Sequence, residues 1–294
     1  MIDLSPLARF LTYVFLVTVM LSIGLEVTGR QVLDALRNVN LMARALVANL
    51  VLVPILGLVL VRLFPMPPDI ATGILILAAA PGAPFAVQFT SKSKDAVAFA
   101  AALLFVLTVV ALIVTPPLAG LLARAEIPLG LPAWRVIRGA VLYLLLPLLV
   151  GFAVQRWARG LGQALRKPAT LCAALSFPAV ILLTMGAKSA ATRAVGVSAL
   201  VAMLLLVLGG MLVGWLLGGP ETGTRRVLAT STGMRNAVVA LLIALTSFPD
   251  SDVDLAVLAF SALMVPPNLV FTVYQNFRAR VRATGPDAPI GAGR

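Results

Sequence analysis

The chain has 294 residues, of which 61% are hydrophobic and only 12% are charged, and its formal net charge is +12. Soluble domains contain about 45–50% apolar and about 25% charged residues, so this composition indicates an integral membrane protein. The basic residues lie in short connections between apolar runs, where they orient membrane helices, and this placement argues against nucleic-acid binding.

Nine apolar segments follow one another along the chain. They cover about residues 7–29, 41–61, 70–90, 95–121, 136–157, 168–187, 194–218, 227–248 and 253–277. Continuous apolar runs of about 20 residues predict membrane helices, whereas membrane strands would alternate apolar and polar residues. We therefore expect an all-α polytopic membrane protein, with one transmembrane domain over residues 1–277 and a polar cytoplasmic tail over 278–294. The first twenty residues lack a cleavage site, and we expect them to begin the first span rather than to form a signal peptide.

The distribution of basic residues predicts the orientation of the chain. Fifteen Lys and Arg side chains fall in the connections on the side of the C-terminus, seven fall on the opposite side, and Arg235 lies within a span. Cytoplasmic connections carry the excess of Lys and Arg in membrane proteins. We therefore expect the N-terminus outside, the C-terminus inside and an odd number of spans.

The residue types that most often hold metals are scarce. There is one cysteine, Cys172, there is no histidine, and no zinc, nucleotide-phosphate or aspartate-rich motif occurs. We therefore expect no metal site and no cofactor, and no histidine to relay protons.

Two of the nine segments, the third and the eighth, contain residues that interrupt a helix. In the third, Pro81 and Pro84 remove backbone donors and Gly82 relaxes the backbone, so the helix should break there. In the eighth, the stretch Thr230–Leu242 (TSTGMRNAVVALL) carries a run of hydroxyl side chains and then Gly233, which predicts a second break. Unpaired backbone groups inside a membrane are tolerated only where they line a cavity or bind something.

The positions of the two breaks predict an inverted repeat. The two segments run in opposite directions across the membrane, and each follows a hairpin of two spans and precedes a long span. Interrupted helices at matching places in two oppositely oriented halves are typical of secondary transporters, which bind their substrate at the repeat interface. We assign the first repeat to about 7–121 and the second to about 136–277. The span at 136–157 has no counterpart before residue 7.

Arg235 is the strongest candidate functional residue, because a formal charge in the middle of a membrane is costly and such residues usually have a function. Two roles are open for it. As a fixed cation it would bind a carboxylate or sulfonate, helped by the positive end of a half-helix. As a structural cation it would bond to the carbonyl groups that the break sets free. We favour the anion-binding role.

Polar side chains near the two breaks complete a candidate substrate site. They are Ser231, Thr232 and Asn236 beside Arg235, Gln88 and Thr90 beyond the first break, and Asn49 in the second span. Each could instead have a purely structural role. A hydroxyl or amide group can solvate a broken helix, or it can form a hydrogen bond between helices that contributes about 0.6 kcal/mol to stability.

The order and spacing of these motifs resemble the bile acid:sodium symporter family, including its bacterial members, over nearly the whole chain. The similar stretches are Met20–Gly29 (MLSIGLEVTG), Asn49–Pro54 (NLVLVP), Ala80–Ala98 (APGAPFAVQFTSKSKDAVA) and Thr232–Ala240 (TGMRNAVVA). The resemblance implies a panel domain and a core domain, with the two crossover helices in the core and alternating access between the domains. It also implies ten spans or, in members that lack the first, nine. A bacterial inner membrane is the location that we expect.

The resemblance implies Na⁺ as a co-substrate, but the residues at the family's sodium positions differ in this chain. The family's Ser-Asn pair in the first crossover falls at residues 85–87, which are Phe-Ala-Val here. The family's Glu is Ser231, its Gln is Arg235, and Asn49 stands where the family has another Gln. Loss of a carboxylate and gain of a guanidinium would repel Na⁺, so we expect Arg235 to replace a bound cation.

We therefore expect a secondary transporter for a small organic anion, such as a bile-acid-like sterol or a carboxylate metabolite, and not an enzyme. The expected partners are that anion and the lipid bilayer.

An arsenite or other metabolite efflux permease of related fold is an alternative. Arsenite permeases rely on a cysteine at the crossover, whereas Cys172 lies away from both breaks. A membrane-embedded lipid-modifying enzyme is a further alternative; its metal would need an acidic cluster such as Asp250, Asp252 and Asp254, which has no basic neighbour in the sequence. A receptor that binds the anion without transporting it also stays open.

Overall fold

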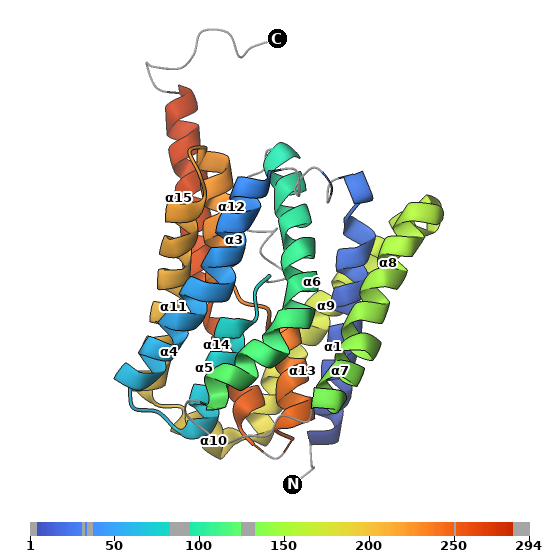
Figure 1. Cartoon of the computed structure of the whole chain (residues 1–294). Helices are drawn as coiled ribbons and strands as arrows, with labels where there is room; N and C mark the ends of the chain where they lie inside the picture. The colour runs from blue at the N-terminus through green and yellow to red at the C-terminus, as the bar shows by residue number, and fades with distance from the viewer. Residues whose placement is uncertain are drawn as a thin grey trace.

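The computed structural model describes residues 5–30, 33, 38–82, 94–124, 133–249 and 251–284. All secondary structure in these ranges is helical (Figure 1). In chain order the elements are α1 (Ser5–Glu26), α3 (Val39–Val47), η1 (Ala48–Leu52), α4 (Val53–Leu63), α5 (Pro68–Ala79), α6 (Lys94–Arg124), α7 (Ala133–Gly139), η3 (Ala140–Leu145), α8 (Leu146–Trp157), α9 (Arg159–Ala187), α10 (Ser189–Ala194), α11 (Gly196–Leu217), α12 (Thr222–Gly233), α13 (Ala237–Ser247), α14 (Val253–Leu263) and α15 (Val265–Thr284).

These helices confirm the prediction of an all-α polytopic membrane protein. Within the described residues, eight continuous or broken helices are long and apolar enough to cross a membrane, and α5 is a shorter apolar helix. Residues 83–93, which include the rest of the third predicted segment, lie outside the described residues. The number of nine spans therefore stays a prediction. The first turn of α1 and the last turn of α15 lie at opposite ends of the bundle, as an odd number of crossings requires (Figure 1).

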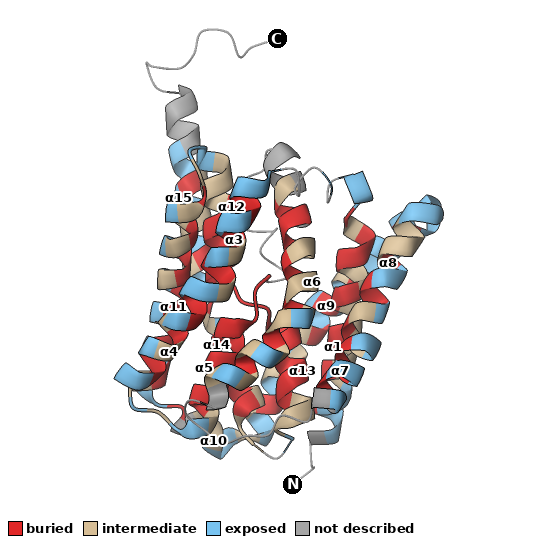
Figure 2. Ribbon diagram, in the orientation of Figure 1, coloured by how far each residue is buried: buried red, intermediate tan, exposed pale blue. Residues whose placement is uncertain are grey.

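The α12–α13 segment is the centre of the bundle. Every residue of the most apolar stretch of this segment is buried. In the other long spans only 28–44% of the residues in the corresponding stretch are buried. Those other spans turn apolar side chains such as Ile113, Leu182 and Leu212 outward, which suits a surface that faces lipid (Figure 2). The long span with the lowest mean hydropathy is therefore shielded from lipid, as is the short helix α5 from Ile70 to Ala79.

Two groups of helices can be distinguished by their contacts, and α6 contacts members of both. In the first, α1 packs along α8 and α9, and the closest approach is between Gly24 of α1 and Gly151 of α8. A Cβ atom on Gly24 would overlap the carbonyl oxygen of Leu148, and one on Gly151 would overlap that of Leu21. Small residues let membrane helices approach this closely. In the second group, α4, α5, α11, α12, α13 and α14 pack against one another. The assignment of these groups to a panel and a core domain stays a prediction.

Two spans contain a π-helical turn, and each turn is followed by a proline. The turn η1 precedes Pro54, and the turn η3 precedes Pro147. Because proline has no backbone N–H, it interrupts the hydrogen-bond ladder of the preceding turn. Single π-turns inside helices occur often at functional sites, and η1 carries Asn49.

One predicted boundary was wrong. The sixth apolar segment was expected to begin near residue 168, but α9 already begins at Arg159, after a break at Ala158. The basic residues Arg159, Arg166 and Lys167 thus lie on a helix rather than in a connection. This first part of α9 buries Gly162 and Ala169 and leaves its long polar side chains exposed. An amphipathic turn of this kind extends a helix beyond its apolar run.

The acidic loop before α14 has a basic partner, contrary to the expectation from the sequence. Lys188, at the end of α9, lies with its Nζ 2.6 Å from Oδ1 of Asp254 and 3.3 Å from Oδ1 of Asp252. Arg9 of α1 donates a hydrogen bond of 3.1 Å to the carbonyl oxygen of Pro249. Asp250 lies outside the described residues. The first helix group is therefore tied to the second at the end where α1 begins.

Candidate functional site

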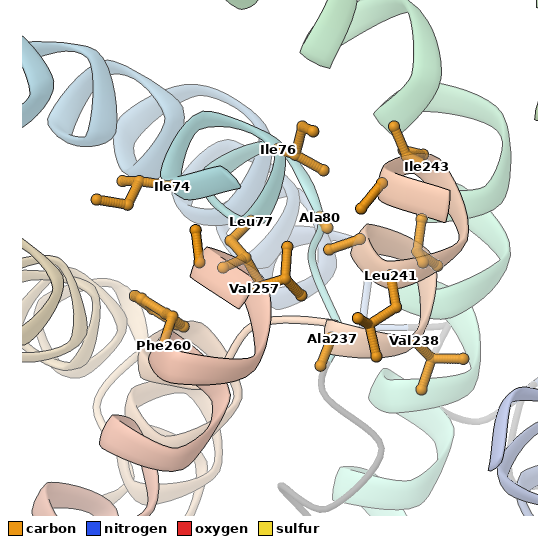
Figure 3. Packing of buried hydrophobic residues seen from close by; sticks show 14 of the residues in the cluster. Ile74, Ile76, Leu77, Ala80, Ala237, Val238, Leu241, Ile243, Val257 and Phe260 are labelled. Atoms are coloured by element: carbon orange, nitrogen blue, oxygen red, sulfur yellow. The ribbon is translucent and has the colours of Figure 1, made fainter. Parts of the chain in front are cut away.

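The first predicted break lies at the end of α5. This helix ends at Ala79, Ala80 is extended, and Gly82 has a φ of 83°, which favours glycine. The helix α5 thus ends directly before Pro81 and Gly82, while Pro84 lies outside the described residues, and the role of these residues as a crossover hinge stays a prediction. Apolar side chains of α5, α13 and α14, including Ile76, Leu241 and Val257, enclose this end of α5 (Figure 3).

The second predicted break lies between α12 and α13. The helix α12 ends at Gly233, Met234 is extended, and α13 begins after Asn236. Gly233 does not have a positive φ. Its role is close packing, because a Cβ atom there would overlap the side chain of Met211 on α11. The break thus follows the glycine and does not depend on its backbone freedom.

The two breaks are in direct contact. The backbone N–H of Asn236 donates a hydrogen bond of 2.9 Å to the carbonyl oxygen of Ala80. Figure 3 shows Ala80 at the end of α5 beside Ala237 at the start of α13. One backbone donor freed by the second break thus pairs with one backbone acceptor freed at the end of α5. This pairing helps both breaks to be tolerated in a buried position.

Arg235 is only 1% exposed, and its guanidinium group donates to four oxygen acceptors. Nε is 3.0 Å from the carbonyl oxygen of Leu77 and Nη1 is 2.8 Å from Oδ1 of Asn49. Nη2 bonds to the carbonyl oxygens of Ala78 and Asn49. All four acceptors are uncharged. The cation is therefore solvated by dipoles, and its positive charge is not neutralised by a carboxylate among these contacts.

Prolines leave two of these acceptors without their usual donors. In an α-helix the carbonyl oxygen of Leu77 would accept from residue 81, which is a proline. In the π-helical turn η1, the N–H of Val53 bonds to Ala48 five residues back. In that register the carbonyl oxygen of Asn49 would accept from residue 54, which is Pro54. The carbonyl oxygen of Leu77 accepts instead from the N–H of Ala80 at 2.9 Å, and Arg235 donates both to it and to the carbonyl oxygen of Asn49.

Asn49 is the residue that joins the second span to the crossover. It is fully buried, and its Nδ2 donates to the carbonyl oxygen of Ala45 at 2.9 Å and to Oγ1 of Thr232 at 3.1 Å. Its Oδ1 accepts from Arg235. Every polar atom of this amide is thereby paired. Of the predicted site residues, Asn49, Thr232 and Arg235 form one connected network.

Asn236 differs, because half of its amide has no partner. Its Oδ1 accepts from the N–H of Val239 at 3.2 Å and caps α13. Its Nδ2 is buried without a hydrogen-bond partner among the described residues. Such a group costs free energy unless water or a ligand binds it. Among the described residues of the predicted site, Asn236 is thus one with a buried donor that has no protein partner.

The hydroxyl groups of Ser231 and Thr230 bond outside this network. Ser231 and Thr230 are buried and bond back to carbonyl groups of their own helix. Gln88 and Thr90 lie outside the described residues.

Thr115 of α6 was not predicted from the sequence, although its Oγ1 donates to the carbonyl oxygen of Ala79 at 2.9 Å. Its position directly before Pro116 and Pro117 was the only signal of a special site.

Replacement of Asn49 by alanine tests the network. The substitution removes an acceptor from a buried guanidinium and the donor to Thr232, and we expect a loss of about 1–3 kcal/mol in the free energy of unfolding. Thermal unfolding of the purified protein measures this. Asn40→Ala, at an exposed position near the start of α3, is the control and should have little effect. Equal stability of the two variants would contradict the network.

The comparison with known families bears on this geometry. The sequence profile of the sodium bile acid symporter family matches residues 13–212, more than half of the chain. The chain belongs to this family. Its members are membrane transporters rather than enzymes, in agreement with the prediction. The match ends before α12, so the second crossover with Ser231 and Arg235 lies beyond it.

Curated relatives of the family are similar over most of the chain. A probable sodium/metabolite cotransporter of Arabidopsis thaliana, BASS1 (chloroplastic), is 26% identical over 245 residues, which are 81% of this chain and 59% of the relative. The rice protein BASS2, of the same description, is 23% identical over 78% of this chain and 55% of its own length. Rice BASS3 is 24% identical over 91% and 64%. The chain therefore spans less than two thirds of the length of these relatives.

Proposed function

We propose that this protein is a secondary transporter that carries a small organic anion across a membrane by alternating access. The observation that supports it most is the contact between the end of α5 and the break between α12 and α13, buried at the centre of an apolar bundle, with an Arg235 charge that no carboxylate among its contacts neutralises. Interrupted helices of this kind form the substrate sites of secondary transporters. The relatives named as sodium/metabolite cotransporters are consistent with a carboxylate-bearing metabolite.

For the coupling ion, we propose that the guanidinium of Arg235 takes the place of a bound Na⁺. The oxygen atoms around it include the C-terminal carbonyl groups of a half-helix, the type of ligand that holds Na⁺ in transporters with broken helices. A fixed cation in that position repels a second one. Transport should then be weakly dependent on Na⁺ or independent of it, unlike what the names of the relatives state for those proteins.

For the substrate, Arg235 supplies a positive field and Asn236 supplies a direct donor. Four bonds of the guanidinium are already directed to protein oxygens, so direct binding of a carboxylate to Arg235 would require some of them to be exchanged. The buried Nδ2 of Asn236 needs no such exchange. We propose that it donates to the substrate while Arg235 favours the anion electrostatically. Gln88, Thr90 and Ser231 stay candidate contacts from the sequence.

Uptake by proteoliposomes tests the proposed function. Labelled bile acids, keto acids, hydroxy acids and inorganic anions are supplied in Na⁺ buffer and in K⁺ buffer. Saturable flux of an organic carboxylate that is the same in both buffers is the expected result. Binding without flux would indicate a receptor, and flux only in Na⁺ buffer would refute the proposed role of Arg235 while leaving the transporter in place.

Asn236→Ser separates substrate binding from stability. Serine is also a good N-cap residue, so α13 keeps its cap, but the Nδ2 donor is lost. We expect KM to rise by about tenfold, the effect of about 1.4 kcal/mol, with thermal unfolding little changed. Asn268→Ser on α15, another buried amide, is the matched control and should leave KM unaltered. An unchanged KM in Asn236→Ser would remove Asn236 from the proposed site.

Alternating access predicts that the ties between the two helix groups open during transport. Cysteines are placed at Lys188 and Asp254 in a Cys172→Ser background and joined by a short bifunctional maleimide. We expect the cross-link to stop transport, because it holds α9 to α14. The control pair is Glu26 and Arg166, whose side chains lie 3.4 Å apart within the first helix group. Equal transport by the two cross-linked proteins would argue against relative motion of the groups.

The rival proposals have less support in the structure. Cys172 is exposed on α9 and is not part of the crossover network, which disfavours a thiol-dependent arsenite permease. Lys188 already pairs with Asp252 and Asp254, so these carboxylates are poorly suited to hold a metal and a diphosphate.

A further inference from the structure

The ends of α1 and α8 enclose a second polar site, far from the crossover in the fold. A pocket of about 670 Å³ is lined by residues 27–30 after α1, by Phe152, Gln155 and Arg156 of α8, and by Arg159 at the start of α9. The ends of α1 and α8 that line it lie at the end of the bundle opposite the first turn of α1 (Figure 1). The transport site proposed above uses none of these residues.

The shape of the pocket follows from the packing of the two helices. At Gly24 and Gly151 the backbones of α1 and α8 are in contact. One turn later the chain leaves α1 while α8 continues, so a space opens between them. Gly29 lines this space without a side chain of its own and faces the ring of Phe152.

The pocket is strongly basic. Arg30, Arg156 and Arg159 all line it, and its lining contains no acidic side chain. The nearest described acid along the chain is Glu26, which pairs with Arg166 at 3.4 Å. Asp34 lies outside the described residues. Arginine groups bind phosphate oxygens through two parallel hydrogen bonds, and a cleft with several of them concentrates anions.

The pocket lies at the level where the apolar surface ends. Trp157, the last residue of α8, is 80% exposed, whereas Leu149 and Val150 earlier in the helix present an apolar outer face. Exposed tryptophan residues at the ends of membrane helices lie at the headgroup level. Val27 and Phe152 give the pocket an apolar floor on the side of the membrane interior.

We propose that this pocket binds the phosphate headgroup of an anionic membrane lipid. The three arginines hold the phosphate, and the apolar floor contacts the glycerol and the first part of the acyl chains. Basic pockets between membrane helices on the cytoplasmic side are typical sites for anionic headgroups, and the count of basic residues predicts that this end is cytoplasmic. The lipid would tie together α1, α8 and α9, the helices of the first group.

Thermal unfolding of the full chain in detergent tests this proposal. Phosphatidylglycerol should raise the unfolding temperature saturably by several degrees, and phosphatidylcholine should not. The variant Arg156→Gln/Arg159→Gln should lose this shift. The control variant Lys167→Gln/Arg278→Gln removes the same charge from exposed positions outside the pocket and should keep it.

Two further measurements distinguish loss of the site from misfolding and a lipid headgroup from a free phosphate. Arg156→Lys/Arg159→Lys keeps the charge and should retain part of the shift, which separates loss of the site from misfolding. Glycerol 3-phosphate without lipid should give no shift. An equal phosphatidylglycerol shift in the wild type and in the Gln variant would overturn the site, and a full shift with glycerol 3-phosphate would overturn the lipid as its source.

Discussion

Arg235→Gln is expected to make transport respond to Na⁺. The shorter, neutral side chain cannot reach all of the oxygens of Leu77, Ala78 and Asn49, so a set of buried acceptors without a cation remains. Na⁺ is the monovalent cation that such a set of carbonyl oxygens suits. Uptake in proteoliposomes should rise with Na⁺ concentration in the variant and stay flat in the wild type.

Arg235→Ala is the companion variant, and we expect it to lose transport. It removes every hydrogen bond of the guanidinium group together with the positive charge that favours the anion, and each charge-assisted hydrogen bond contributes about 1.5–3 kcal/mol. Binding of the organic anion should weaken by more than about tenfold. Arg138→Gln, an exposed arginine of α7, controls for the loss of one charge and should transport normally. Sodium-driven uptake in the wild type that survives in Arg235→Gln would refute this account of the crossover.

Gly24→Ala is expected to have the largest effect on stability. The new methyl group would overlap the backbone oxygen of Leu148, which cannot move aside as a side chain could. Overpacking of this kind costs about 1–3 kcal/mol or more, so the unfolding temperature should fall by about 5 °C. The α1–α8 contact would open, and the yield of folded protein should fall with it.

The matched control is Gly186→Ala in α9, where a Cβ atom meets nothing within 4 Å. Alanine favours a helix over glycine by up to about 1 kcal/mol, so this variant should be at least as stable as the wild type. If both alanine variants unfold at the same temperature, close packing at Gly24 is not what joins α1 to α8.

The sequence predicted the features that depend on local chain chemistry. Apolar length predicted the spans, and the missing N–H of Pro81 together with the freedom of Gly82 predicted the end of α5. The same reasoning singled out Arg235, because a charge in an apolar segment is costly wherever the segment lies. Asn49 was recognised as a polar side chain in the apolar second span, and its carbonyl oxygen accepts a hydrogen bond from Arg235.

Only the tertiary structure decided which groups meet. Arg235 bonds to residues more than 150 positions away, and Lys188 pairs with aspartates more than 60 positions away. No periodicity or motif encodes such distances, because they depend on how whole helices pack. The same holds for Thr115, which pairs with a backbone oxygen of another helix, and for the three arginines that the chain after α1, the end of α8 and the start of α9 bring to one pocket. The sequence thus determined where the helices break and where the charge lies, and packing determined what the charge touches.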